Sequence, residues 1–296
     1  MQNLNQRVLL SSVLALAAVL SACGGGGGSS GSSNGGTPTP SNPTPIAATI
    51  NEGNYLNAVA LTGLAADRLD DVNTMIAYLY SAVIATQGLP GSYPCPLGGS
   101  VTVGLQSSTY TFTAQGCRFA SYTVQSGTIT ATGASASQVN GVYYLMGGNF
   151  VFTDVDYLSQ SQAGNQVMNG QFKLTRNGDL SLDASGQASV RRNGRTDTYT
   201  QLQVRTGTPD TRTHEVQIDK LAFRLETPRF PLALTVAGDS RTGTITATDS
   251  SNITFTQQAT AYKYELRRTT GATPFYTATL ADSDAAFKAA LEEMLK

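Results

Sequence analysis

The spacing of apolar residues takes three forms along the chain, and each predicts a different kind of structure. Val8–Leu20 is an apolar run interrupted only by two serines. From about Tyr55 to Thr86, apolar residues recur every three or four positions, which is the period of an amphipathic helix. From Ser100 to about Leu280, short runs of Thr, Val, Tyr and Phe are separated by Gly and Asn, as in strands and hairpins. The pattern predicts a mainly β domain with a helix in front of it.

The helical stripe predicts one amphipathic helix, or a helix pair, at the start of this domain. Gly63 could divide the segment, and Gly88-Leu89-Pro90 ends it. Such a helix either covers the apolar face of a sheet or is offered to a partner, and we expect it to cover the sheet. The stripe consists of Leu69, Val72, Ile76, Leu79 and Val83.

Two Asn-Gly pairs predict hairpin turns within the β region. Asn177-Gly178 and Asn193-Gly194 place residues that tolerate positive φ where type I′ turns need them. Strands on either side of these turns would form an antiparallel meander from about Val167 to Val204. We therefore expect the domain to be an antiparallel meander that forms a curved sheet or an incomplete barrel.

A short helix is predicted at the end of the chain. Asp282 or Ser283 can cap its first turn, and Phe287, Leu291 and Leu295 fall on one face. The sheet would then have a helix at each end of its sequence.

The first β segments predict a hairpin between two cysteines. The segments Val101–Gln106 and Thr109–Ala114 would pair, which brings Cys95 and Cys117 close together at the open end of the hairpin. We expect a structural disulfide, because the chain has no Cys-x-x-Cys motif that would indicate a redox or metal site. This bridge would contribute about 3 kcal/mol to stability.

The apolar run near the N-terminus predicts an export signal. Arg7 precedes it, and its thirteen residues are fewer than the roughly 20 that a membrane-spanning helix needs. The sequence Leu20-Ser21-Ala22-Cys23 that follows resembles the lipobox of bacterial lipoproteins. This resemblance implies cleavage before Cys23, a diacylglyceryl group on the Cys23 thiol, and an acyl chain such as palmitate on the new amino terminus. An ordinary secretory peptide cut after Ala22 is the alternative.

The residues after Cys23 predict a spacer between a lipid anchor and the domain. They are almost all Gly and Ser up to Gly36 and Pro-rich up to Pro45, and a chain of this length has a root-mean-square span of about 25 Å. We therefore divide the chain into a signal peptide (1–22), a lipidated, disordered linker (23–46) and one globular domain (47–296). Gly24 is not the aspartate that the resemblance associates with inner-membrane retention, so we expect anchoring in the outer membrane, on either its periplasmic or its surface face.

Charge and residue content argue against several classes of function. The net charge of −1 offers no excess of cations for a nucleic acid partner. His214 is the single histidine, and the Gly238–Gly243 segment "GDSRTG" resembles an esterase motif but has no histidine after it, so we expect it to be a turn.

Two further groups of charged residues are candidate sites. Asp154 and Asp156 alternate onto one face of a strand, where they could bind calcium or act as an acid and base pair. The segment Arg191–Arg195 could present three guanidinium groups near a hairpin tip. Solvated surface residues explain both groups without a function.

We expect a non-enzymatic binding or structural lipoprotein of the cell envelope. It would have no catalytic residue, no metal site and no cofactor, and it would meet the membrane through its lipid and an envelope ligand or protein through its domain. The alternative is an envelope enzyme, namely a hydrolase that depends on carboxylates such as those of Asp154 and Asp156.

Overall fold

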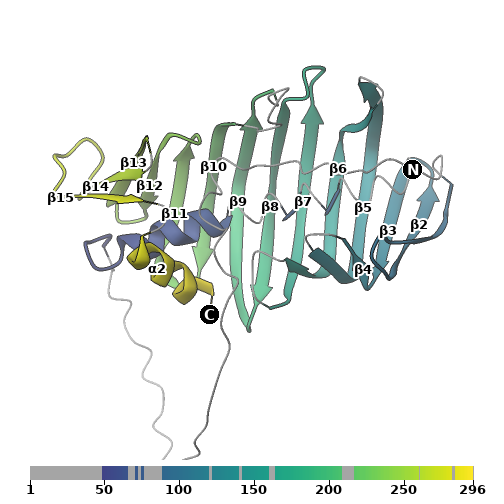
Figure 1. Ribbon diagram of the computed structural model, residues 1–296, viewed down its shortest axis with the longest axis horizontal. Helices are drawn as coiled ribbons and strands as arrows, with labels where there is room; N and C mark the ends of the chain where they lie inside the picture. The colour runs from purple at the N-terminus through teal and green to yellow at the C-terminus, as the bar shows by residue number, and fades with distance from the viewer. Residues whose placement is uncertain are drawn as a thin grey trace, which may run out of the picture.

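The β region forms one large antiparallel sheet that is open at both ends (Figure 1). The computed structural model describes residues 49–65, 71–72, 75–76, 89–119, 122–139, 142–159, 164–208, 217–259, 261–281 and 284–295. The sheet has 15 strands, and neighbours in space are neighbours in sequence, apart from the short β4, which pairs with β5 beside β3. The predicted antiparallel meander is therefore confirmed, and the sheet does not close into a barrel.

The strands lie close to the predicted positions. The first hairpin, predicted at Val101–Gln106 and Thr109–Ala114, is formed by β2 and β3. The strands are β1 Gly91–Pro94, β2 Ser100–Gln106, β3 Thr109–Gln115, β4 Cys117–Arg118, β5 Tyr122–Val139, β6 Val142–Ser159, β7 Gln166–Arg176, β8 Leu182–Arg192, β9 Arg195–Thr206, β10 Ile218–Thr227, β11 Phe230–Gly238, β12 Thr242–Ala247, β13 Asn252–Gln258, β14 Ala261–Arg267 and β15 Tyr276–Ala281.

The two Asn-Gly turns differ from each other. Asn193 and Gly194 both have positive φ (48° and 74°), as the predicted type I′ turn between β8 and β9 requires. In the turn between β7 and β8, however, the residue with positive φ is Leu180, at 67°. The Asp179 carboxylate accepts hydrogen bonds from the Ser181 N–H and hydroxyl, which closes a longer loop. The type I′ prediction is therefore wrong at Asn177-Gly178.

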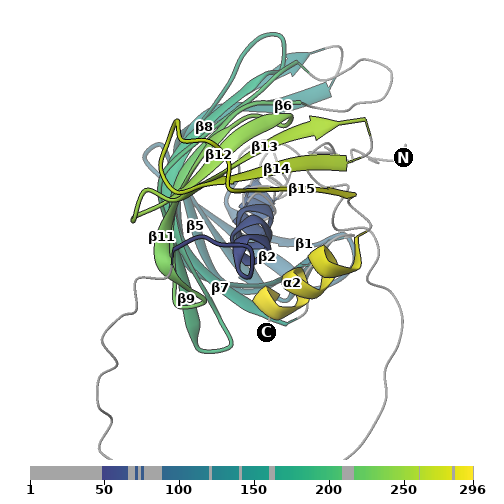
Figure 2. The same cartoon turned by 90° about the vertical axis from the view of Figure 1, so that its left-hand side faces the viewer.

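The sheet curves around the N-terminal helical residues (Figure 2). Residues 55–65, 71–72 and 75–76 are helical, and their side chains Leu61, Leu64 and Met75 are at most 2% exposed. Val72 and Ile76 of the predicted stripe are also buried, whereas Leu69, Leu79 and Val83 lie outside the described residues. These helical residues cover the sheet, as expected, and none of the described helices is long and apolar enough to cross a membrane.

We call the sheet face toward these residues the inner face and the opposite face the outer face. Successive side chains of each strand point alternately to the inner and the outer face. On β7, Phe172 and Leu174 are buried on the inner face, while Gln171 and Lys173 are exposed on the outer face. Phe152 of β6 packs edge-on against Phe172, with ring centroids 5.3 Å apart. The core thus lies between the inner face and the helices.

The C-terminal helix α2 spans Ala285–Leu295. Asp284 caps it, since its Oδ1 accepts the Ala286 N–H at 2.8 Å, while Asp282 and Ser283, the predicted caps, lie outside the described residues. Its buried residues are Phe287, Ala290 and Met294, with Leu291 packed beside them. Met294 was not expected in the apolar stripe, although it falls seven positions after Phe287, where the helical period returns to the same face.

Cys95 and Cys117 form a disulfide, with their Cα atoms 5.4 Å apart. The register of β2 and β3 brings the two ends of this hairpin together, since Ser100 lies opposite Gln115. The expected pairing of these two cysteines is therefore confirmed.

Tyr55 links the N-terminal helix to the last strands, and its burial is expected to lower the folding stability at high pH. It is 4% exposed and packs against the rings of Tyr276 and Tyr264 at 5.7 and 6.2 Å. Burial, followed by the effects of Tyr276, raises the pKa of Tyr55 from 10.0 to about 12. The unfolded chain therefore loses this proton at lower pH than the folded chain, and folding stability should fall as the pH rises from about 10 to about 12.

The urea midpoint measured across this pH range should fall less for a Tyr55→Phe variant, which has no phenol proton to lose at this position. Equal falls in the variant and the unchanged chain would assign the alkaline loss to other groups.

Candidate functional site

Two of the residues considered from the sequence lie outside the described part of the chain. These are Cys23, the expected lipidation site, and His214. The "GDSRTG" segment is the turn between β11 and β12, as expected, and the Asp239 carboxylate closes it by accepting the backbone N–H groups of Arg241 and Thr242 at 2.7 and 2.8 Å.

Asp154 and Asp156 lie on the outer face of β6, Asp154 within a β-bulge and Asp156 just after it. The register of β6 and β7 shifts between Phe152 and Val155, and Asp154 has a φ of 46°. Asn169 of β7 holds Asp154 from two sides: its Oδ1 accepts the Asp154 N–H at 2.8 Å and its amide nitrogen donates to the Asp154 carboxylate at 3.0 Å. This geometry gives Asp154 a role in fixing the bulge.

The arginines at the hairpin between β8 and β9 point to opposite faces. Arg191 and Arg195 are exposed, but Arg192 is only 4% exposed because alternation turns every second side chain of β8 inward. The interpretation of three guanidinium groups at the tip is therefore wrong for Arg192.

The outer face carries rows of threonines that continue from strand to strand. Thr102, Thr113, Thr128 and Thr153 stand opposite one another across β2, β3, β5 and β6. At the other end of the sheet, Thr244 pairs with Thr254 and Thr242 with Thr256. All of these side chains are exposed or half-buried. The outer face is thus a broad surface of hydroxyl groups.

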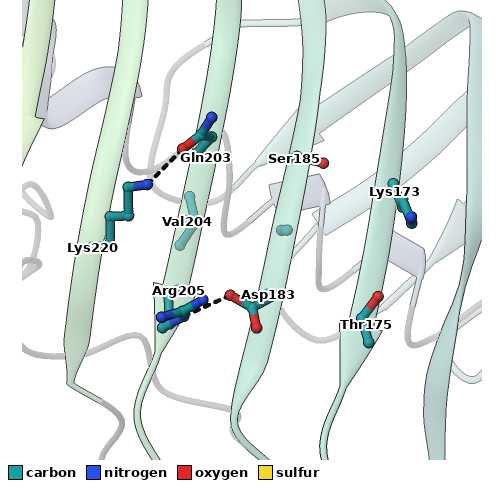
Figure 3. Close-up of a pocket in the computed structure, with 9 residues that line it drawn as sticks. Lys173, Thr175, Asp183, Ser185, Gln203, Val204, Arg205 and Lys220 are labelled. Atoms are coloured by element: carbon teal, nitrogen blue, oxygen red, sulfur yellow. Dashed lines mark hydrogen bonds and ion pairs between the residues drawn. The ribbon is translucent and has the colours of Figure 1, made fainter.

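A shallow depression interrupts this face over β7, β8, β9 and β10 (Figure 3). Its volume is about 280 Å³. Two rows of paired residues form it, one through Lys173, Ser185 and Gln203, the other through Thr175, Asp183, Arg205 and Lys220. Ala184 and Val204 complete its lining.

Most of the charges in this depression are held by neighbours on the same face. The Arg205 Nε donates to the Asp183 carboxylate at 2.7 Å, and this hydrogen bond with the attraction of the carboxylate raises the pKa of Arg205. The Lys220 Nζ donates to the Gln203 side-chain oxygen at 2.6 Å. Figure 3 shows Lys173 across the depression from Lys220, with Ser185 between them on β8.

Sequence reasoning missed this depression, although part of the signal was present. Alternation along the meander places Lys173 and Thr175 on the solvent face of β7. It does not say which residues of the next three strands stand beside them, and that register determines the site.

Comparison with known proteins supplies no assignment: the chain matches no known family, no curated protein and no solved structure. Within the residues described, no group of three or more His, Cys, Asp or Glu side chains is arranged to hold a metal ion. The function must therefore be argued from the geometry of the domain.

Proposed function

We propose that this protein is a lipid-anchored module of the bacterial outer membrane that binds an envelope ligand through the outer face of its sheet and catalyses no reaction. The observation that carries this proposal is the difference between the two faces of the sheet. The described helical residues pack on the inner face, whereas the outer face carries exposed and half-buried polar side chains and the depression over β7 to β10.

The disulfide and the N-terminal sequence support an envelope location. Disulfides persist mainly in oxidising compartments such as the periplasm, which suits the bridge between Cys95 and Cys117. The lipobox-like sequence at Cys23 and the Gly/Ser/Pro segment behind it would hold the domain near a membrane and leave it room to turn.

The chemistry of the outer face supports binding. Hydroxyl and amide groups on neighbouring strands are spaced by roughly 4.5 to 5.5 Å, so a polar ligand that lies across the strands can make repeated hydrogen bonds. A preformed array of this kind loses little conformational freedom when the ligand binds, because the strands already fix the backbone.

Native mass spectrometry of the protein extracted from membranes tests both parts of the proposal. The unchanged protein should carry a covalent lipid mass at Cys23 and a non-covalently bound species. A Cys23→Ser variant should lose the lipid mass and either stay unprocessed or be released from the membrane. In both forms it should retain the bound species, because its outer face is intact.

Two outcomes would contradict the proposal. Equal incorporation of labelled palmitate into the Cys23→Ser variant would show that Cys23 is not the anchor. A protein that carries the lipid but no bound species, even in the mildest extraction, would favour a purely structural role.

A further inference from the structure

The depression on the outer face has an excess of positive charge. Lys173, Arg205 and Lys220 contribute three cations, and Asp183 contributes the one carboxylate of the lining. Because Asp183 is paired with Arg205, the two lysines supply the positive charge that remains. Asp219 also lies nearby, where it adds to the raised pKa of Arg205, but its carboxylate lies against Gly207 at the end of β9.

The strands place the two lysines at opposite sides of a low floor. β7 and β10 are separated by β8 and β9, so their backbones are roughly 14 Å apart at the usual strand spacing. Between them the floor is formed by the short Ser185 and by Gln203, which stands opposite it. Long cationic side chains therefore flank a hollow with a hydroxyl group on its floor (Figure 3).

The charge and the donors suit an oxyanion with several oxygen atoms. An ammonium group has three N–H donors and binds phosphate as a point charge. The Ser185 and Thr175 hydroxyls can donate further hydrogen bonds to the same group. The amide of Gln203 orients Lys220 through the 2.6 Å hydrogen bond, so this lysine is already held in place before a ligand arrives.

We propose that the depression lined by Lys173, Ser185, Gln203 and Lys220 binds a phosphate group, with the two lysines as its cationic contacts. This inference rests on the proposed function, since it names the chemical class of ligand for the same face. The phosphate can belong to a lipid headgroup, because the protein is expected to be tethered at a membrane, or to a soluble phosphate compound.

The test uses the full chain carrying Cys23→Ser, so that no lipid of its own contributes to vesicle binding. Inorganic phosphate is titrated while the backbone amide signals of Lys173, Ser185 and Lys220 are followed by nuclear magnetic resonance. Co-sedimentation is then measured with vesicles of phosphatidylcholine alone and of phosphatidylcholine mixed with phosphatidylglycerol. Binding of phosphate alone assigns the site to soluble phosphates, and binding of the vesicles alone assigns it to headgroups.

The chain provides a matched control for net charge. Changing Lys173 and Lys220 together to Gln should weaken binding by roughly tenfold or more, because two charge-assisted contacts are lost. Changing Lys263 of β14 and Lys288 of α2 together to Gln removes the same net charge away from the depression and should leave the affinity within about twofold. Both pairs of lysines are exposed or half-buried, so neither change should disturb the fold.

If the two double variants lost affinity equally, the net charge of the protein would explain the binding, and the proposal would be overturned. Failure of the Cys23→Ser chain, with all its lysines in place, to bind either probe would overturn it as well. In that second case a bound species seen by native mass spectrometry would leave the proposed function standing, and only its phosphate chemistry would be wrong.

Discussion

Removal of the chain through Ile76 is expected to give a protein that aggregates, whereas removal of residues 1–46 should leave one that is soluble and unfolds cooperatively. The deleted residues include helical side chains that are buried against the inner face, among them Leu61, Leu64 and Met75. Each buried apolar side chain of this size contributes about 1.5 to 3 kcal/mol. Their loss would also uncover inner-face residues such as Tyr264 and Tyr276, whose rings pack against Tyr55, and large exposed apolar patches promote association.

A chain shortened only to Ala47 is the control for this deletion. It retains Ile50, which is fully buried and whose N–H donates to the Ser251 hydroxyl at 3.0 Å. Light scattering and urea unfolding should show a monomer with one cooperative transition for the shorter deletion and aggregates for the longer one. If the longer deletion proved as stable and soluble as the control, the helical residues would have no part in the fold and would be available to a partner.

The sequence predicted structure correctly where residues close together in the chain determine it, as in the first hairpin and the Asn193-Gly194 turn. Alternation with a short turn located β2 and β3 to within one residue of each end. Asn193-Gly194 identified its turn because two residues with positive φ in succession demand such a pair. The cysteine pairing followed from that first hairpin.

The depression could not be predicted because it depends on a β-bulge between β8 and β9, and no residue pattern in the sequence indicates that bulge. Counted from the turn at Asn193-Gly194, Asp183 would stand opposite Val204, and Arg205 would point to the other face of the sheet. The register shifts by one residue between Gly186 and Ala188, where Gln201 of β9 has a φ of 55°. This shift brings Arg205 opposite Asp183.

The buried charges of the inner face were missed for a different reason. Charged residues are rarely buried unless they are paired, so sequence reasoning places them in solvent by default. Arg192 and Asp197 fall on inner positions of β8 and β9 by strict alternation, and that pattern was the available signal. Which partners they meet depends on β10 and β11, two hairpins further along the chain.

Asp197→Ala is expected to destabilise the fold by about 3 to 5 kcal/mol, whereas Asp183→Ala should barely move the urea midpoint. Both aspartates pair with an arginine, and distance alone would rank them the other way. The exposed pair of Asp183 and Arg205 is separated by 2.7 Å, while the buried pair of Asp197 and Arg229 is separated by 3.6 Å.

The burial of each ion pair should determine which substitution costs more stability. The Asp197 and Arg229 side chains are 3% and 2% exposed, and the Thr227 hydroxyl donates to the Asp197 carboxylate at 2.6 Å. Removal of the Asp197 carboxylate leaves a buried guanidinium without that counter-charge, and water cannot reach it to compensate. In the exposed pair, side chains that are 44% and 60% accessible simply return to solvent.

A double variant distinguishes the cost of leaving the buried Arg229 charge without the Asp197 carboxylate from the cost of losing their contact. Replacing Asp197 by Leu and Arg229 by Met together removes both charges and keeps apolar volume, so it should regain much of the stability that Asp197→Ala loses. Urea unfolding of the three variants supplies the comparison. If Asp197→Ala and Asp183→Ala cost the same, water would reach the Asp197 and Arg229 side chains, and burial would not determine which of the two pairs matters more for stability.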